Sequence, residues 1–298
     1  MYLNDFEYYA PKTSGEILDL VGRLGTKAKI LAGGTDLLIM MKEKMLKPDY
    51  LIDINDVQEL KGISYEPGKG AVIGTATKIS EIEHSDLIRE KYFALSQAAG
   101  ELGSAQVRAM ATLGGNSCHA SPAAETPPPL VALGAKVVVK SIAGEKELPL
   151  EDFILGNRKT ALVEGEILTK FLLPEPAPRS ASRYSYIGLR DAMEIDAVNM
   201  AVNLALENDG RTVKSLRMVM GSVSPVPLIA VEAQSILVGR EFNQELMEKA
   251  AQAASGEANP ISDIRASAEY RREMVAVLAR RLLQQAFNAA SGTKEGNW

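Results

Sequence analysis

Two glycine-rich segments carry the residues best suited to chemistry in this chain. The first reads AGGTDL over residues 32–37, and the second reads ATLGGN over residues 111–116. Paired glycines let a backbone approach a ligand closely, because no Cβ atom stands in the way. They also let successive N–H groups converge on an anion. Two such segments in one domain indicate a ligand with two phosphates that is held from both sides.

The first segment is predicted at a junction between a strand and a helix. Residues 28–32 are typical of a short buried strand, and residues 37–45 of a helix capped by Thr35 or Asp36. The start of a helix favours a phosphate. The segment has neither the G-x-G-x-x-G fingerprint nor the Walker lysine, which argues against a Rossmann unit and a P-loop NTPase. Taken alone, it is equally compatible with an ordinary tight turn.

The second segment lies in a longer run of small hydroxyl and amide side chains, between residues 103 and 125. Such a run can hydrogen-bond a pyrophosphate and a sugar chain without adding charge. Glu125 could accept hydrogen bonds from ribose hydroxyls, as acidic residues do in nucleotide sites. Its alternative interpretation is a solvated carboxylate at the entrance of a helix.

Composition and charge exclude several classes of function. The net charge of −5 argues against nucleic acid as a partner, since phosphate binding needs clustered Lys and Arg. Cys118 is the single cysteine, so the chain alone cannot hold an iron–sulfur cluster. Two histidines, His84 and His119, are too few for a zinc site. We therefore expect no metal in this chain and redox chemistry, if any, from an organic cofactor. The roles of Cys118 and His119 stay open.

The beginning of the sequence lacks a basic region followed by an apolar run, so it does not resemble a signal peptide. No stretch approaches the roughly 20 apolar residues of a membrane span. These observations predict a cytoplasmic protein with no membrane span.

The pattern of apolar residues predicts a mixture of helices and strands, and 298 residues suggest about two domains of roughly 150 residues each, although one large domain is possible. A proline-rich linker is expected at 174–179. Arg271, Arg272, Arg280 and Arg281 are expected on the solvated face of the last helix. The remaining predicted helices are 14–24, 79–92, 94–102, 130–133, 229–237, 244–254 and 268–288, and the remaining strands are 50–54, 136–141, 146–150, 167–173, 198–207 and 213–223, with a hairpin at 60–75.

The order of these segments resembles the FAD-binding subunits of the molybdenum hydroxylase, or xanthine dehydrogenase, family, which includes the medium subunit of carbon monoxide dehydrogenase. Besides the glycine segments, the matching stretches are IGTAT at 73–77, SPAAETP at 121–127, GEIL at 165–168 and RDAMEI at 190–195. The resemblance spans nearly the whole chain. It implies a vanillyl-alcohol-oxidase (PCMH)-type FAD-binding fold in two subdomains, 1–57 and 58–177, followed by an α+β C-terminal domain over 180–290, with an antiparallel sheet and helices.

The resemblance also implies which residues contact FAD. The first segment would bind the pyrophosphate through its N–H groups, and the second would bind the pyrophosphate and the flavin side. Glu125 would lie near the ribose and Leu168 near the flavin ring. Where the family often has a lysine linked to the flavin, this chain has Tyr186, whose hydroxyl cannot stabilise reduced-flavin charge as an ammonium does. The implied contacts are Ala32, Gly33, Gly34, Thr35, Asp36, Leu37, Thr75, Ala111, Thr112, Gly114, Gly115, Asn116, Ser117, Ser121, Glu125, Leu168 and Tyr186.

The function implied is that of an electron-transfer subunit with no catalytic acid or base of its own. A molybdopterin large subunit would oxidise the substrate, and an iron–sulfur small subunit with [2Fe-2S] clusters would relay electrons to FAD. The FAD would pass them to NAD⁺, a quinone or oxygen. Two alternatives stay open: a self-contained FAD-dependent reductase or oxidase of the same fold, and a scaffold that has lost the cofactor. Turnover of NAD(P)H with an organic substrate by the isolated chain would favour the first alternative.

Overall fold

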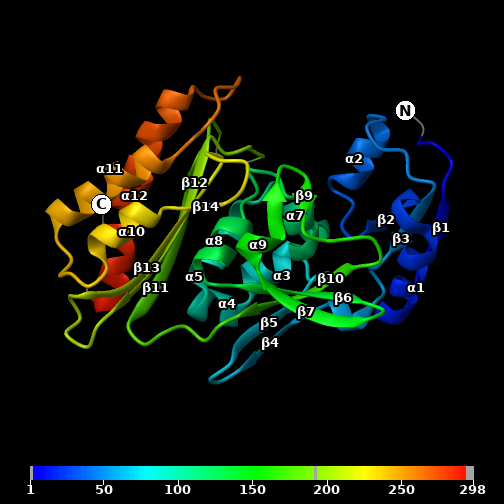
Figure 1. Ribbon diagram of the computed structural model, residues 1–298, viewed down its shortest axis with the longest axis horizontal. Helices are drawn as coiled ribbons and strands as arrows, with labels where there is room; N and C mark the ends of the chain where they lie inside the picture. Colours follow the sequence, from blue (N-terminus) through cyan, green and yellow to red (C-terminus); the bar gives the residue numbers. More distant parts are fainter. Residues whose placement is uncertain (1–2, 191–192, 293–298) are drawn as a thin grey trace.

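The computed structural model describes residues 3–190 and 193–292 (Figure 1). Three units follow one another along the long axis of the molecule, in the order of the sequence. Each unit contains its own sheet and a set of helices. The mixture of helices and sheets agrees with the expected α+β class. In the described part of the chain, no helix combines the length and apolar character that a membrane span requires.

The first unit has a three-stranded parallel sheet in the order β1-β3-β2. Helix α1 begins where the Thr13 hydroxyl accepts a hydrogen bond from the N–H of Glu16, and it buries Ile17 and Leu18 in a small core. The elements are β1 (Glu7–Tyr9), α1 (Ser14–Leu24), η1 (Gly25–Lys27), β2 (Ala28–Leu31), α2 (Leu37–Lys42), β3 (Tyr50–Asp53) and η2 (Gln58–Leu60).

Strand β2 is not the buried strand that the sequence predicted. It lies at the edge of its sheet, and Lys29 and Ile30 are exposed to a cleft instead of entering the core. An apolar stretch does not distinguish a core strand from one that faces a ligand cavity.

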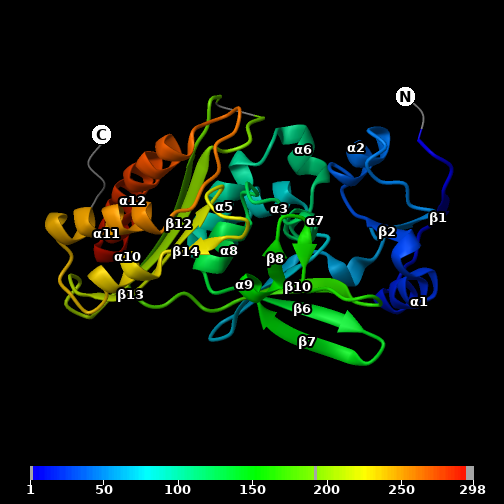
Figure 2. The same ribbon diagram turned by 45° about the horizontal axis from the view of Figure 1, so that its top comes forward.

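The second unit has a five-stranded antiparallel sheet in the order β4-β5-β10-β6-β7. In Figure 2 the helices of this unit lie above the sheet, and β6 and β7 form its lower edge. The elements are β4 (Ile63–Glu66), β5 (Gly70–Gly74), α3 (Ile79–His84), α4 (Asp86–Lys91), α5 (Phe93–Glu101), α6 (Ala105–Met110), α7 (Leu113–His119), α8 (Pro127–Ala132), β6 (Lys136–Ser141), β7 (Gly144–Pro149), α9 (Leu150–Phe153), β8 (Ile154–Gly156), β9 (Lys159–Thr160) and β10 (Ile167–Leu173).

The single helix predicted over 79–92 is two helices. Ser85 has an extended backbone between α3 and α4, and its hydroxyl accepts a hydrogen bond from the N–H of Ile88. The serine therefore caps a new helix, which apolar periodicity alone does not reveal.

The third unit has a four-stranded antiparallel sheet in the order β11-β12-β13-β14. Its helices cover the outer face, and α5 and α8 of the second unit cover the inner face (Figures 1 and 2). Both faces are thus buried, and β12 is apolar almost throughout. The elements are β11 (Ser180–Ile187), β12 (Val198–Leu206), β13 (Val213–Gly221), β14 (Leu228–Ile229), α10 (Val231–Leu237), α11 (Gln244–Glu257) and α12 (Ala268–Ser291).

Arg271 departs from the predicted solvated face of α12. Its side chain is 3% exposed and donates hydrogen bonds to the carbonyls of Ala197 and Ser222 and, at 2.7 Å, to the Asp263 carboxylate. The guanidinium therefore joins α12 to the end of the sheet and to the loop before the helix. Arg280, on the same helix, pairs with Glu248 at a partly exposed site, as expected for a surface arginine.

The variant Arg271→Met should lower the free energy of unfolding by about 3 kcal/mol, because it leaves Asp263 and two carbonyls without their partner. The matched variant Arg280→Met should cost less than about 1 kcal/mol, since its ion pair is solvated. Urea unfolding of the purified chain, followed by circular dichroism, measures both values. Equal losses for the two variants would contradict the structural role of Arg271.

Candidate functional site

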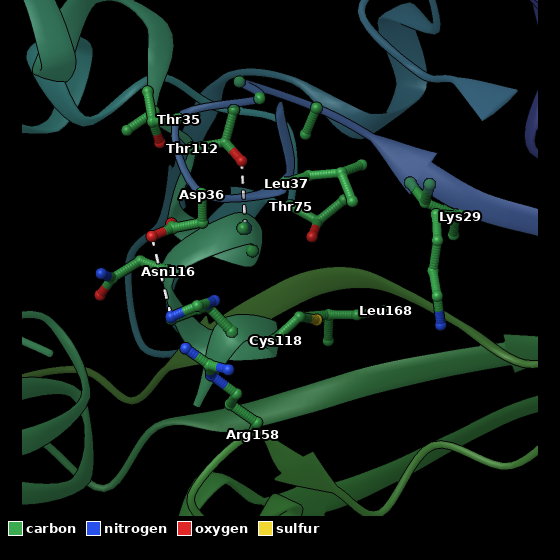
Figure 3. Close-up of a pocket in the computed structure, with 18 of the residues that line it drawn as sticks. Lys29, Thr35, Asp36, Leu37, Thr75, Thr112, Asn116, Cys118, Arg158 and Leu168 are labelled. Atoms are coloured by element: carbon green, nitrogen blue, oxygen red, sulfur yellow. Dashed lines mark hydrogen bonds and ion pairs between the residues drawn. The ribbon is translucent and has the colours of Figure 1, made fainter. Parts of the chain in front are cut away.

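A cleft of about 1020 Å³ lies between the first and second units. One wall comes from β2 and α2, and the other from α7 and β10. Its volume reaches the upper end of the range for small-molecule sites, roughly 300–1,000 Å³. All of the predicted contact residues line it except Ser117 and Tyr186. Figure 3 shows residues from both walls around the same space.

The first glycine segment presents a row of backbone donors to this cleft. The N–H groups of residues 33–37 make no hydrogen bond to any other described residue, and these residues line the cavity. Gly34 has a φ of 71°, a conformation that other residues rarely adopt. Successive unpaired N–H groups at a strand-to-helix turn form a concave site for an anion.

The predicted side-chain cap of α2 is absent. Asp36 occupies the N-cap position, but it makes no cap hydrogen bond. Its carboxylate instead lies 3.7 Å from Nε2 of His119 on the opposite wall, as the dashed line in Figure 3 marks. The N–H of Leu37, the first residue of α2, therefore stays open toward the cleft, whereas that of Leu38 donates to the carbonyl of Gly34.

The second glycine segment is not a loop, because Gly114 and Gly115 lie in the first turn of α7. The Thr112 hydroxyl caps the helix by accepting from the N–H of Gly115 at 3.0 Å. The N–H groups of residues 113, 114 and 116 bond to the carbonyls of residues 77, 75 and 112. The expectation that both glycine pairs present N–H groups to an anion is therefore wrong for the second pair.

Two of the glycines are required where protein segments meet each other. A Cβ atom on Gly33 would lie 2.2 Å from the carbonyl oxygen of Met110, and one on Gly114 would lie 1.7 Å from Oγ1 of Thr75. Both positions would clash with backbone or packed side-chain atoms. Gly33 thus sets the distance between the two walls, and Gly114 lets α7 pack on Thr75 within the second unit. Gly115 is exposed to the cleft.

Two carboxyl groups near the cleft, those of Glu125 and Asp196, have raised pKa values. Desolvation, and then the charge of Asp196, raise the pKa of Glu125 to about 8, although a hydrogen bond with Asn116 acts against this. Thr126 donates to Oδ1 of Asn116 at 2.6 Å, so the amide nitrogen is the group that faces Glu125. Burial raises the pKa of Asp196 to about 7, against hydrogen bonds from Asn199 and Tyr184.

Ser117 and Tyr186 are the two predicted contacts that do not line the cleft. Ser117 is fully buried within α7, and its hydroxyl has no hydrogen-bond partner among the described residues. Tyr186 is on β11, and its ring lies against Gly188, beside the Glu194 side chain. Glu194 and Ile195 line the cleft, whereas Tyr186 does not. Residues 191–192 of the RDAMEI stretch lie outside the described residues.

Several cleft residues were missed by the sequence analysis. They include basic Lys29 and Arg158, which Figure 3 shows on either side of Leu168, and an apolar group on and beyond α2. Asp196, which does not line the cleft but whose charge acts on Glu125, was also missed. A basic or acidic residue on a single strand or loop gives no local sign that it faces a cavity built from distant segments. The missed apolar group comprises Met40, Met45 and Leu46, which lie beside the predicted contact Leu37.

Cys118 lines the cleft as a thiol, because burial raises its pKa to about 12. Such a thiol is a poor nucleophile at neutral pH. Among the described residues, no group of three or more His, Cys, Asp or Glu side chains is placed to hold a metal ion.

The raised pKa values of Glu125 and Asp196 predict how stability depends on pH. The folded chain retains these two protons up to about pH 8 and 7, whereas the unfolded chain releases them near pH 4 to 5. The free energy of unfolding of the ligand-free chain should therefore fall as pH rises between about 5 and 8. The slope for each group is at most about 1.4 kcal/mol per pH unit.

Glu125→Gln should make this slope shallower in urea unfolding experiments between pH 5.5 and 8. Glu245→Gln is the matched control, because Glu245 is an exposed carboxylate whose pKa is lowered by Lys249 and which is ionised throughout this range. An unchanged slope in Glu125→Gln would refute the assignment of a bound proton to Glu125.

Comparison with known proteins identifies the family. Residues 4–176 match the FAD binding domain in molybdopterin dehydrogenase, and residues 183–286 match the CO dehydrogenase flavoprotein C-terminal domain. The chain is 33% identical to the carbon monoxide dehydrogenase medium chain of Hydrogenophaga pseudoflava, over 95% of this chain and 97% of that protein. It is 31% identical to the glyceraldehyde dehydrogenase medium chain of Sulfolobus acidocaldarius, over 96% and 99%.

A solved structure shows the same architecture. Carbon monoxide dehydrogenase from Hydrogenophaga pseudoflava, in a form lacking the Mo-pyranopterin moiety, has a chain that superposes with a TM-score of 0.92 and 32% identity. The match covers 97% of this chain and 99% of that one. The expected fold, an FAD-binding domain followed by an α+β C-terminal domain, and the expected cofactor are confirmed. The chain belongs to the family of FAD-binding medium subunits of the molybdenum hydroxylases, which includes those of carbon monoxide and xanthine dehydrogenases.

Proposed function

We propose that this chain takes electrons from the [2Fe-2S] clusters of a small partner subunit and passes them through FAD to a final acceptor. The observation that carries the proposal is the row of unpaired N–H groups at residues 33–37, which opens into a cleft large enough for a dinucleotide. FAD supplies the redox chemistry when bound, and the protein supplies binding, orientation and electrostatics.

The residues present fit a diphosphate between two different walls. The N–H groups of residues 33–37 would hold the phosphate oxygens, and Thr35 would add a hydroxyl donor. Lys29 and Arg158 bring positive charge to the same cavity. A row of amide dipoles assisted by cations is a favourable environment for a phosphate anion in a partly dry cleft.

The opposite wall would hold the sugar chain and the flavin. Asn116, Ser121 and Glu125 offer hydrogen-bonding groups, and Leu168 offers an apolar surface. With a pKa of about 8, the carboxyl of Glu125 is largely protonated at neutral pH and donates a hydrogen bond as well as accepting one. The contacts assigned to Ser117 and Tyr186 stay predictions, since neither residue lines the cleft.

The proposed partners are an iron–sulfur small subunit and a molybdopterin large subunit, in which the substrate is oxidised. Two relatives with nearly equal identity are medium chains of a carbon monoxide dehydrogenase and a glyceraldehyde dehydrogenase. Since these substrates differ, we infer that the medium chain does not select the substrate.

NAD⁺, a quinone and oxygen are the candidate electron acceptors, and a cytoplasmic location is part of the proposal. Because these relatives are named as chains of larger dehydrogenases, we prefer this function to a self-contained reductase or oxidase.

The proposal predicts about one FAD per folded chain, measured from the absorbance of flavin released by denaturation. Gly33→Ala should remove most of this flavin, because the added Cβ would lie 2.2 Å from the Met110 carbonyl oxygen and push the donor row out of place. Gly22→Ala is the control: it lies in α1 with no atom within 4 Å of the new Cβ, and it should retain FAD and gain up to about 1 kcal/mol of stability.

A folded wild-type chain that binds no FAD would overturn the proposed function. Full flavin content in Gly33→Ala would instead overturn the assignment of the FAD pyrophosphate to the first glycine segment. It would remain compatible with FAD bound elsewhere in the cleft.

A further inference from the structure

We propose that Lys78, acting through Asn55, is a positioning residue that holds the donor row of residues 33–37 in register with the opposite wall of the cleft. The inference rests on the proposed FAD site. Lys78 itself does not line the cavity, so its effect on the cofactor is indirect.

The ammonium group of Lys78 connects the two walls. Nζ donates to Oδ1 of Asn55 at 3.0 Å and to the carbonyl oxygen of Met110 at 3.0 Å. Its backbone pairs with Thr112 in an isolated bridge, and the N–H of Ile79 donates to the carbonyl of Ala111. The residue is therefore fixed to the start of α7 by its backbone and reaches toward the first unit with its side chain.

Asn55 carries the connection to the first glycine segment. Its Nδ2 donates to the carbonyl of Ala32 at 2.7 Å, and its amide is oriented by the Asp53 carboxylate, also at 2.7 Å. The carbonyl of Ala32 and the N–H of Gly33 belong to one trans peptide, so they point in opposite directions. Because the carbonyl of Ala32 is held toward Asn55, the N–H of Gly33, which is the first donor of the row, points away from Asn55.

Lys78 also places a positive charge behind the donor row. The side chain is half-buried, bonds to neutral oxygens and makes no ion pair with a described carboxylate. Burial, with a contribution from nearby Lys61, lowers the pKa of Lys78 below its usual value. Glu81 and Asp53 act on this cation without contacting it. A cation whose direct partners are neutral oxygens is favourable where an anion binds close by, as a diphosphate would in this cleft.

The core shared by the two units does not depend on Lys78. Ile17 and Ile52 of the first unit pack with Ala76 and Ile167 of the second, and all four are buried. The loss of two polar contacts at the edge of this core should therefore leave the chain folded.

Lys140 provides a matched control. Its Nζ donates to Oγ of Ser14 at 2.9 Å, so it is a partly buried lysine that joins the second unit to α1. It touches neither glycine segment. A general weakening of the boundary between the units would affect Lys78→Met and Lys140→Met alike.

The experiment compares full-length wild-type chain, Lys78→Met, Lys78→Arg, Asn55→Ala and Lys140→Met, each freed of flavin. FAD is titrated into each protein by fluorescence quenching, and thermal unfolding is recorded before FAD is added. Lys78→Met and Asn55→Ala should each weaken FAD binding about tenfold. Lys78→Arg should recover most of the loss, because it keeps the charge and the donors. Lys140→Met should bind FAD as the wild type does.

The outcomes separate this inference from the proposed function. Wild-type chain that does not bind FAD overturns both. Tight binding by the wild type and by Lys78→Met overturns the positioning role alone, and so does an equal loss in Lys78→Met and Lys140→Met. If Lys78→Met does not fold, the result for Asn55→Ala decides. Weakened FAD binding by Asn55→Ala, with an unfolding temperature within about 3 °C of the wild type, supports the inference, and unchanged FAD binding overturns it.

Discussion

The architecture of the cleft depends on the approach of Gly33 to the carbonyl of Met110. No side chain fits between these two backbone segments, because a Cβ atom would come within 2.2 Å of the oxygen. The first unit can therefore lie directly on the second at this point and open into a cavity beside it. The row of free donors at residues 33–37 begins at this contact.

The two glycine pairs solve different physical problems, although their sequences look alike. The pair at Gly33 leaves a row of N–H groups without protein acceptors, whereas the turn at Gly114 uses its own N–H groups to start α7. One wall is thus rich in unpaired backbone donors, whereas the N–H groups at the start of α7 on the other wall are paired within the protein. We therefore propose that one wall recognises the diphosphate and that the other contacts the rest of the cofactor.

Short-range features were predictable from the sequence, and long-range ones were not. The three helices of the third unit and its strands β12 and β13 followed from periodicity, whereas β11 and β14 were not predicted. The membership of Glu125 and Leu168 in the cleft followed from local motifs that resemble a family. The burial of Arg271 did not, since two of its partners lie 49 and 74 residues away. The division between the two proposed FAD-binding subdomains near residue 57 stays a prediction, because one core includes residues on both sides of it.

The small core of the first unit has a consequence for the life of the protein in a cell. Few buried apolar residues hold this unit to the rest of the molecule, so a ligand that spans both walls contributes a large share of the adhesion there. The supply of FAD would then be coupled to the degradation of this protein. Newly made chains without FAD would open more often at the boundary between the first and second units, and cellular proteases would remove them before they join an assembly.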